Sequence, residues 1–227
     1  MDLKEAMTAR HSVRQYKDQP LSPEAVAALE AEIEVCNREG GLHIQLVRDE
    51  PRAFDGFMAH YGKFSGVKNY FALVGKKGPD LEEKCGYYGQ RLVLKAQQLG
   101  LNTCWVALTY GKVKTAFAVD SGEKLCVVIA LGYGETQGVP HKSKRPEEVA
   151  PAVEVAPAVG TAPRWFRDGV EAALLAPTAM NQQKFTLSPE GDKVTARAGM
   201  GFYTKMDLGI VKYQFELAAG RENFRWA

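Results

Sequence analysis

Two arginines and a serine alternate near the start of the chain, as Arg10, Ser12 and Arg14. In an extended segment alternate side chains point to the same side, so these three groups can converge on one anion. Guanidinium groups suit phosphate and the electron-rich edge of a heteroaromatic ring. Taken alone, however, such a segment is more often a solvated turn.

A second candidate segment runs from Ala176 to Gln183 and holds a proline, a threonine and three amide side chains. Amides donate and accept hydrogen bonds, which suits a ligand edge that carries both kinds of atom. Pro177 disfavours continuation of the preceding helix and leaves backbone groups free for a ligand. A polar loop between a helix and a strand explains the same residues equally well.

A basic segment at residues 141–145 directly follows a predicted strand. Surface solvation is the ordinary interpretation of such charges, although they could also neutralise a phosphate. The sequence has no glycine-rich phosphate loop and no Gly-x-Ser-x-Gly nucleophile motif. Its four cysteines and four histidines are scattered, so we expect no metal site and a reducing, cytoplasmic environment.

Composition restricts the class of protein. The 227 residues carry a net charge of +2, and 45% of them are hydrophobic, which excludes a disordered, collagen-like or coiled-coil chain. The near-neutral charge gives no basic field for nucleic acid. No apolar run reaches the roughly 18 residues that a membrane helix needs, and the start of the chain lacks a secretory signal. We therefore expect a small-molecule ligand rather than nucleic acid or membrane.

Helices and strands must position the candidate segments. Helix starts are indicated by Asp2 with Glu5, by Ser22 before a proline, and by Pro79-Asp80. Residues 145–163 contain four prolines and predict an extended connector. Periodicity predicts helices over residues 2–10, 24–37, 79–99, 113–118, 165–176 and 207–219, and strands over 43–47, 70–75, 102–108 and 124–133 and near Phe185 and Val194.

The chain also shows a weak internal repeat. In both halves a helix leads through a short loop to a strand. Each half further contains a helix bracketed by glycines at the same separation, Gly89 to Gly100 and Gly209 to Gly220. A duplicated unit would explain this, because two similar halves can pack around a pseudo-twofold axis as a homodimer does. Chance likeness between two helix–strand units is the alternative.

Together the segments resemble motifs of the nitroreductase family of FMN-dependent oxidoreductases. The resemblance covers the family's arginine motif, a helix-to-strand signature, the strand end that follows, a basic tail motif and a Pro-Ser-Ser-x-Asn-x-Gln loop. The matching segments here are residues 10–16, 99–105, 130–135, 141–148 and 177–183.

One departure from the family pattern shapes the expected architecture. In ordinary members the asparagine loop lies early, where this chain has residues 36–41, and FMN binds between two subunits that contribute one motif each. The resemblance thus implies an α+β, nitroreductase-like three-layer α/β/α fold, built as a single-chain pseudo-dimer around a mixed, mainly antiparallel sheet. The expected parts are a first half (residues 1–144), the connector (145–163) and a shortened second half (164–227).

The resemblance also implies a role for individual residues. Arg10 and Ser12 hold the FMN phosphate, with Lys144 or Arg145 beside them, and His11 lies along the ribityl chain. Arg14 lies at the N1/O2 edge of the isoalloxazine, where a cation stabilises the reduced flavin. Ala179 and Lys184 depart from the family's Ser and Pro. The remaining expected contacts are the backbone of Val106, Ala107 and Leu108 and, from the other half, Pro177, Thr178, Ala179, Asn181 and Gln183.

The implied activity is hydride transfer from NAD(P)H through FMN to a nitroaromatic, a quinone or a similar acceptor in a ping-pong scheme. The resemblance implies one FMN per chain and no need for a partner subunit, with further dimerisation open. A flavin-binding protein with little or no NAD(P)H turnover is the main alternative. An interaction domain without FMN is a weaker one, because decay at random would not preserve one complementary set of motifs.

Overall fold

The chain is described by a computed structural model over residues 1–153 and 162–227. The helices are α1 (Leu3–Ala9), α2 (Pro23–Gly40), α3 (Phe57–Tyr61), α4 (Leu81–Gln98), α5 (Pro146–Val149), α6 (Arg164–Ala173) and α7 (Thr204–Ala219), with 3-10 turns η1 (Pro51–Phe54), η2 (Pro151–Val153), η3 (Ala179–Asn181) and η4 (Arg221–Asn223). The strands are β1 (Gln45–Val47), β2 (Asn69–Lys76), β3 (Asn102–Val106), β4 (Glu123–Gly132), β5 (Phe185–Glu190), β6 (Lys193–Ala198) and β7 (Arg225–Trp226). Within the described ranges, none of the helices combines the length and the apolar character of a membrane span.

The strands form two sheets instead of the single sheet that the family resemblance implies. The first has the order β1-β2-β4-β3 with antiparallel neighbours throughout, and Ala130 on β4 pairs with Tyr70 on β2 and with Cys104 on β3. The second has the order β5-β6-β7, antiparallel and then parallel. The predicted α+β class is confirmed.

Local sequence explains where the first helices begin. Asp2 and Glu5 form a capping box, in which each side chain accepts a hydrogen bond from the other's backbone N–H. The Ser22 hydroxyl accepts from the N–H of Ala25, and the residue that caps the end of α2 is Gly41, whose φ of 62° suits glycine. These predicted starts are confirmed.

Two predicted segments differ in the structure. Residues 113–118 form a turn instead of a helix, because the backbone N–H and C=O of Ala118 bond to the Gln45 side chain and so cannot join a helical ladder. Six residues also supply little cooperative helix stability. The connector begins with α5 and η2 rather than an extended chain, and its residues 154–161 lie outside the described part.

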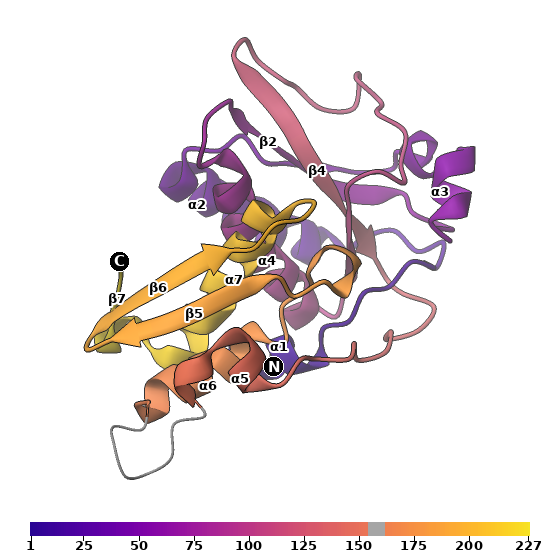
Figure 1. Ribbon diagram of the computed structural model, residues 1–227. Helices are drawn as coiled ribbons and strands as arrows, with labels where there is room; N and C mark the ends of the chain where they lie inside the picture. Colours follow the sequence, from indigo (N-terminus) through magenta and orange to yellow (C-terminus); the bar gives the residue numbers. More distant parts are fainter. Residues whose placement is uncertain (154–161) are drawn as a thin grey trace.

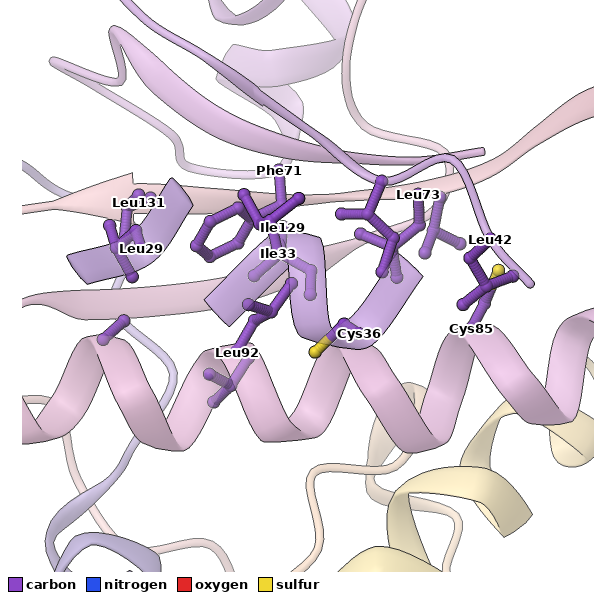
Figure 2. Close-up of a cluster of buried hydrophobic side chains, with 14 of the residues drawn as sticks. Leu29, Ile33, Cys36, Leu42, Phe71, Leu73, Cys85, Leu92, Ile129 and Leu131 are labelled. Carbon is purple, nitrogen blue, oxygen red and sulfur yellow. The ribbon is translucent and has the colours of Figure 1, made fainter. Parts of the chain in front are cut away.

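Of the four hydrophobic cores in the described residues, two join the long helices to the sheets. Between α2, α4 and the first sheet lie buried side chains that include Leu29, Ile33, Phe71 and Leu92 (Figure 2). A second core joins α6 and α7 to the hairpin of β5 and β6. The first sheet with α2 and α4 forms one part of the molecule, and the second sheet with α6 and α7 forms the other. The helices α4 and α7 pack against each other in the middle of the molecule and connect the two parts (Figure 1). Burial of these apolar faces is the main favourable contribution to the fold.

The order of elements is similar on both sides of this helix pair. When α1, η1, α3 and β4 are set aside, the first part runs α2, β1, β2, α4, β3. When η3 and η4 are set aside, the second part runs α6, β5, β6, α7, β7. In the first sheet β4 separates β2 from β3, which are therefore parallel to each other. In the second sheet β7 pairs directly with β6, also in parallel.

Candidate functional site

A pocket of about 390 Å³ opens between the two parts of the chain. Its size is in the usual range for small-molecule sites. Its polar wall comes from the N-terminal segment and its apolar floor from β3, β4 and α7. The lining residues are Arg10, His11, Ser12, Arg14, Cys104, Trp105, Val106, Ala107, Val127, Val139, Pro140, His141, Pro177, Thr178, Ala179, Met180, Asn181, Tyr203, Met206, Asp207 and Ile210.

The arginine segment runs alongside β3 as an extended chain. This explains why its side chains alternate in direction. Ser12 forms a parallel bridge with Thr103, and the Val13 N–H donates to the Thr103 carbonyl at 3.0 Å. Val13 is buried on the opposite side, as expected for an extended chain. The Arg14 guanidinium is exposed and lies 6.0 Å from the centre of the Phe64 ring.

Arg10 is the unusual group in the pocket. It is 4% exposed, its Nε has no hydrogen-bond partner, and no carboxylate of the described residues forms an ion pair with it. Burial lowers its pKa to about 10, which leaves it charged at neutral pH. An uncompensated buried charge costs free energy, so this end of the pocket favours an anion. Burial and the Arg10 charge also lower the pKa of His11, which favours neutral imidazole.

The amide loop is held by its own side chains. The Asn181 and Gln183 amides both donate to the Lys142 carbonyl, at 2.8 and 2.9 Å, and the Lys144 N–H donates to Gln183 Oε1. The Gln182 amide donates to Asp207 and to the Phe202 carbonyl. Three residues of the loop, Met180, Asn181 and Gln183, have φ between 45° and 53°. Most of the amide capacity therefore fixes a strained loop, and Asn181 still reaches the pocket wall.

The structure does not bring every predicted site residue to the pocket wall. Gln183 is buried and does not line the pocket, and the Lys144 ammonium donates to its carbonyl at 3.0 Å. Arg145 is largely exposed and pairs with Glu147 and Glu148. The Leu108 side chain is 70% exposed and follows the lining residue Ala107. The other predicted residues line the pocket together, although they are far apart in sequence.

The first turns of α7 contribute lining residues that are not among the predicted site residues. Met206 and Ile210 lie four residues apart and form the floor, a spacing that also describes an ordinary core helix. Asp207 is 3% exposed, and its carboxylate accepts from the Ala179 N–H at 2.9 Å and from the Gln182 amide at 2.7 Å. Burial raises the pKa of Asp207 to about 6. In the sequence, the one signal that could have pointed to Asp207 is its position directly before an apolar run.

One group of possible metal ligands lies elsewhere. His43, Asp120 and Glu123 cluster beside β1 and the start of β4, and none of them lines the pocket. The His43 Nδ1 and a Glu123 carboxylate oxygen are 2.9 Å apart, so these two side chains satisfy each other. The pocket itself combines an anion-binding end with an apolar floor, which suits a phosphorylated heteroaromatic ligand.

Comparisons with known proteins bear on the family and the fold. A family model described as "Putative TM nitroreductase" matches residues 2–219, and no curated protein matches the chain. A putative nitroreductase from Thermotoga maritima MSB8 has a similar structure, with a TM-score of 0.66 and 21% identity over 98% of this chain and 85% of that one.

Two further structures share the fold over a smaller share of this chain. A putative NADH dehydrogenase/NAD(P)H nitroreductase from Parabacteroides distasonis has a TM-score of 0.52 and 21% identity. A putative nitroreductase in complex with FMN from Desulfovibrio desulfuricans has a TM-score of 0.50 and 22% identity. Each similarity covers 65% of this chain and 95% of the other.

Proposed function

The chain belongs to the family described as "Putative TM nitroreductase", and on this basis we propose that it is an FMN-dependent oxidoreductase with its flavin site in the pocket between the two parts. The observation that carries the proposal is the buried, unpaired guanidinium of Arg10 at the polar end of that pocket. A phosphate group would supply the missing negative charge and accept the free Nε–H. The related protein from Desulfovibrio desulfuricans is described in complex with FMN.

The residues present fit FMN in their chemistry. Arg10 and Ser12 would hold the phosphate, and His11 would lie along the ribityl chain. The exposed Arg14 would place a positive charge near the isoalloxazine and favour its reduced form. Thr178 and Asn181 would contact the flavin from the second part of the chain, and Val106 and Ala107 would do so from the end of β3. We assign no flavin contact to four predicted residues that do not line the pocket, Lys144, Arg145, Leu108 and Gln183.

Bound FMN would supply hydride transfer from a nicotinamide and then to an acceptor, so that the two substrates would use one pocket in turn. The chain's own contribution would be binding, orientation and charge. The buried floor of Val127, Met206 and Ile210 would exclude water from the flavin's inner side. NAD(P)H as donor and a nitroaromatic or quinone as acceptor belong to this proposal.

We also propose that the two parts are the halves of a pseudo-dimer. The repeated element order and the parallel relation of β7 to β6 and of β3 to β2 support it. In the second half no strand of the described residues occupies the place of β4, so β7 pairs directly with β6. One complete site per chain would result, with no need for a partner subunit.

The proposal is tested by mixing the FMN-loaded protein with NADH or NADPH in the absence of oxygen. Loss of the oxidised flavin's visible absorbance, and its return on addition of 1,4-benzoquinone, is the expected result. Bound FMN that neither nucleotide reduces would show a flavin-binding protein without turnover. Failure to bind added FMN at all would refute the proposal.

A further inference from the structure

Two apolar side chains stand at the opening of the pocket and face solvent. Val139 is 79% exposed and Met180 is 94% exposed, and both line the pocket. They come from opposite parts of the chain, Val139 from the segment after β4 and Met180 from η3. We call this pair the outer rim. Exposed apolar groups beside a ligand pocket mark a surface that gains free energy when a ligand covers it.

The backbone of Met180 has a strained conformation, and the packing of the Met180 side chain does not offset this strain. Its φ of 52° and ψ of 24° lie in the left-handed region, which favours glycine. A side chain that is 94% exposed buries almost nothing that could offset this strain. Strain of this kind is typically kept at positions that serve binding or catalysis.

The rest of the loop holds Met180 in place. The Ala179 N–H and the Gln182 amide both donate to the Asp207 carboxylate, at 2.9 and 2.7 Å. The Asn181 amide donates to the Lys142 carbonyl. Hydrogen bonds thus hold the residues on both sides of Met180. The backbone that carries the Met180 side chain is therefore fixed at the opening of the pocket.

Contacts of neighbouring residues limit the movement of the segment that carries Val139. Gly138, with a φ of 71°, lies so close to His11 and Ser12 that a larger side chain would meet them. Two residues after Val139, the imidazole Nε2 of His141 lies 3.0 Å from the Leu174 carbonyl. Both rim side chains are therefore presented by fixed backbone, which favours a geometric role in specificity over a disordered surface.

We propose that the outer rim determines which electron acceptors the protein uses, and that it selects aromatic or quinonoid acceptors with an apolar arm. The acceptor's ring would enter the pocket, and its alkyl arm would lie between Val139 and Met180. This inference rests on the proposed function, because it presupposes FMN in the pocket. It adds the substrate class and the residues that select it.

Binding of two non-reducible ligands, benzoate and 4-hexylbenzoate, tests the rim without turnover. Isothermal titration of the FMN-loaded protein should show tighter binding of 4-hexylbenzoate, by about tenfold. In the double variant Val139→Ala/Met180→Ala this preference should fall to about twofold, because most of the apolar contact with the arm is lost. Benzoate affinity should stay nearly constant.

The chain offers matched controls. Met200 is 93% exposed and Val119 is 45% exposed, and neither lines the pocket. The double variant Met200→Ala/Val119→Ala removes the same two residue types elsewhere and should keep the full preference. The kinetic counterpart is the ratio of kcat/KM for 2-hexyl-1,4-benzoquinone to that for 1,4-benzoquinone, which should fall only in the rim variant.

The outcomes separate this inference from the proposed function. If FMN does not bind, the proposed function itself fails. If FMN binds with unchanged affinity but the rim variant keeps the preference for the hexyl ligands, the rim inference is wrong. If the rim variant instead loses FMN affinity, the rim contacts the cofactor, and the inference is again overturned.

Discussion

Gly86 on α4 and Gly209 on α7 occupy reciprocal positions where the two helices cross. A Cβ atom on Gly86 would overlap the Met206 carbonyl, three residues before Gly209, and a Cβ atom on Gly209 would overlap the Glu83 carbonyl, three residues before Gly86. A twofold axis between two copies of one helix would produce this reciprocity. It supports the proposal that the chain is a pseudo-dimer.

Replacement of either glycine by alanine should destabilise the protein by about 3 kcal/mol, because the contacting atoms belong to backbone that cannot turn aside. Urea denaturation measures this. Gly111→Ala is the control, since its Cβ would have only ordinary contacts, and it should change stability by less than about 1 kcal/mol. Similar stabilities for all three variants would show that the helices can separate without cost.

The glycines show which part of the helix packing can be predicted from the sequence. Equal glycine spacing relates Gly89 to Gly209, whereas the structure relates Gly86 to Gly209. Gly89 instead faces Trp105 and Leu73 in the first core. The spacing finds two similar helices, but which face of each meets the other depends on the packing of both halves. The caps at Asp2 and Ser22 were predictable because they depend on neighbouring residues alone.

Replacement of Arg10 by methionine should weaken FMN binding on the order of 100-fold, because a buried charge pair with phosphate is lost. Stability without FMN should be unchanged or higher, since the variant removes an unpaired buried charge. Flavin fluorescence titration and urea denaturation measure the two effects. Arg145→Met, in an exposed arginine of the basic segment, should bind FMN normally. Equal losses in both variants would contradict the assigned phosphate position.

The candidate site was predictable where side-chain direction follows from local structure. Arg10, Ser12 and Arg14 share a side because the segment is extended beside β3. The directions of Lys144 and Arg145 depend on partners that spacing does not reveal, Gln183 and the acidic residues of α5. Asp207 and its neighbours were missed because their floor position depends on how α7 packs on the first half.

Replacement of Asn181 by alanine should weaken FMN binding about tenfold, because it removes a lining amide and the bond that ties the strained loop to Lys142. The same fluorescence titration measures it. Asn223→Ala is the matched control, since its amide also donates to a carbonyl, that of Ala219, but lies outside the pocket. If only variants of the arginine segment affect FMN, the site is not shared between the halves.

The stability of the FMN-free protein should carry a pH dependence from Asp207. Because burial raises the pKa of this carboxyl from 3.8 to about 6, the folded state binds the proton more tightly than the unfolded chain. Asp207 should therefore make the protein about 1 kcal/mol more stable at pH 5 than at pH 7.

Urea denaturation of the FMN-free wild type and of Asp207→Asn at both pH values isolates this contribution. His11, whose pKa burial lowers, acts in the opposite direction but is present in both proteins, so the comparison removes it. An identical pH dependence in the two proteins would show that Asp207 titrates as in the unfolded chain.

The central claim is that one chain builds one complete flavin site from its two halves. Native mass spectrometry after incubation with excess FMN tests it most directly, because it reports chain number and bound FMN for each species. A single chain that carries one FMN should be the main flavin-bound species. Two FMN per chain, or FMN found only on assemblies of two or more chains, would contradict the account.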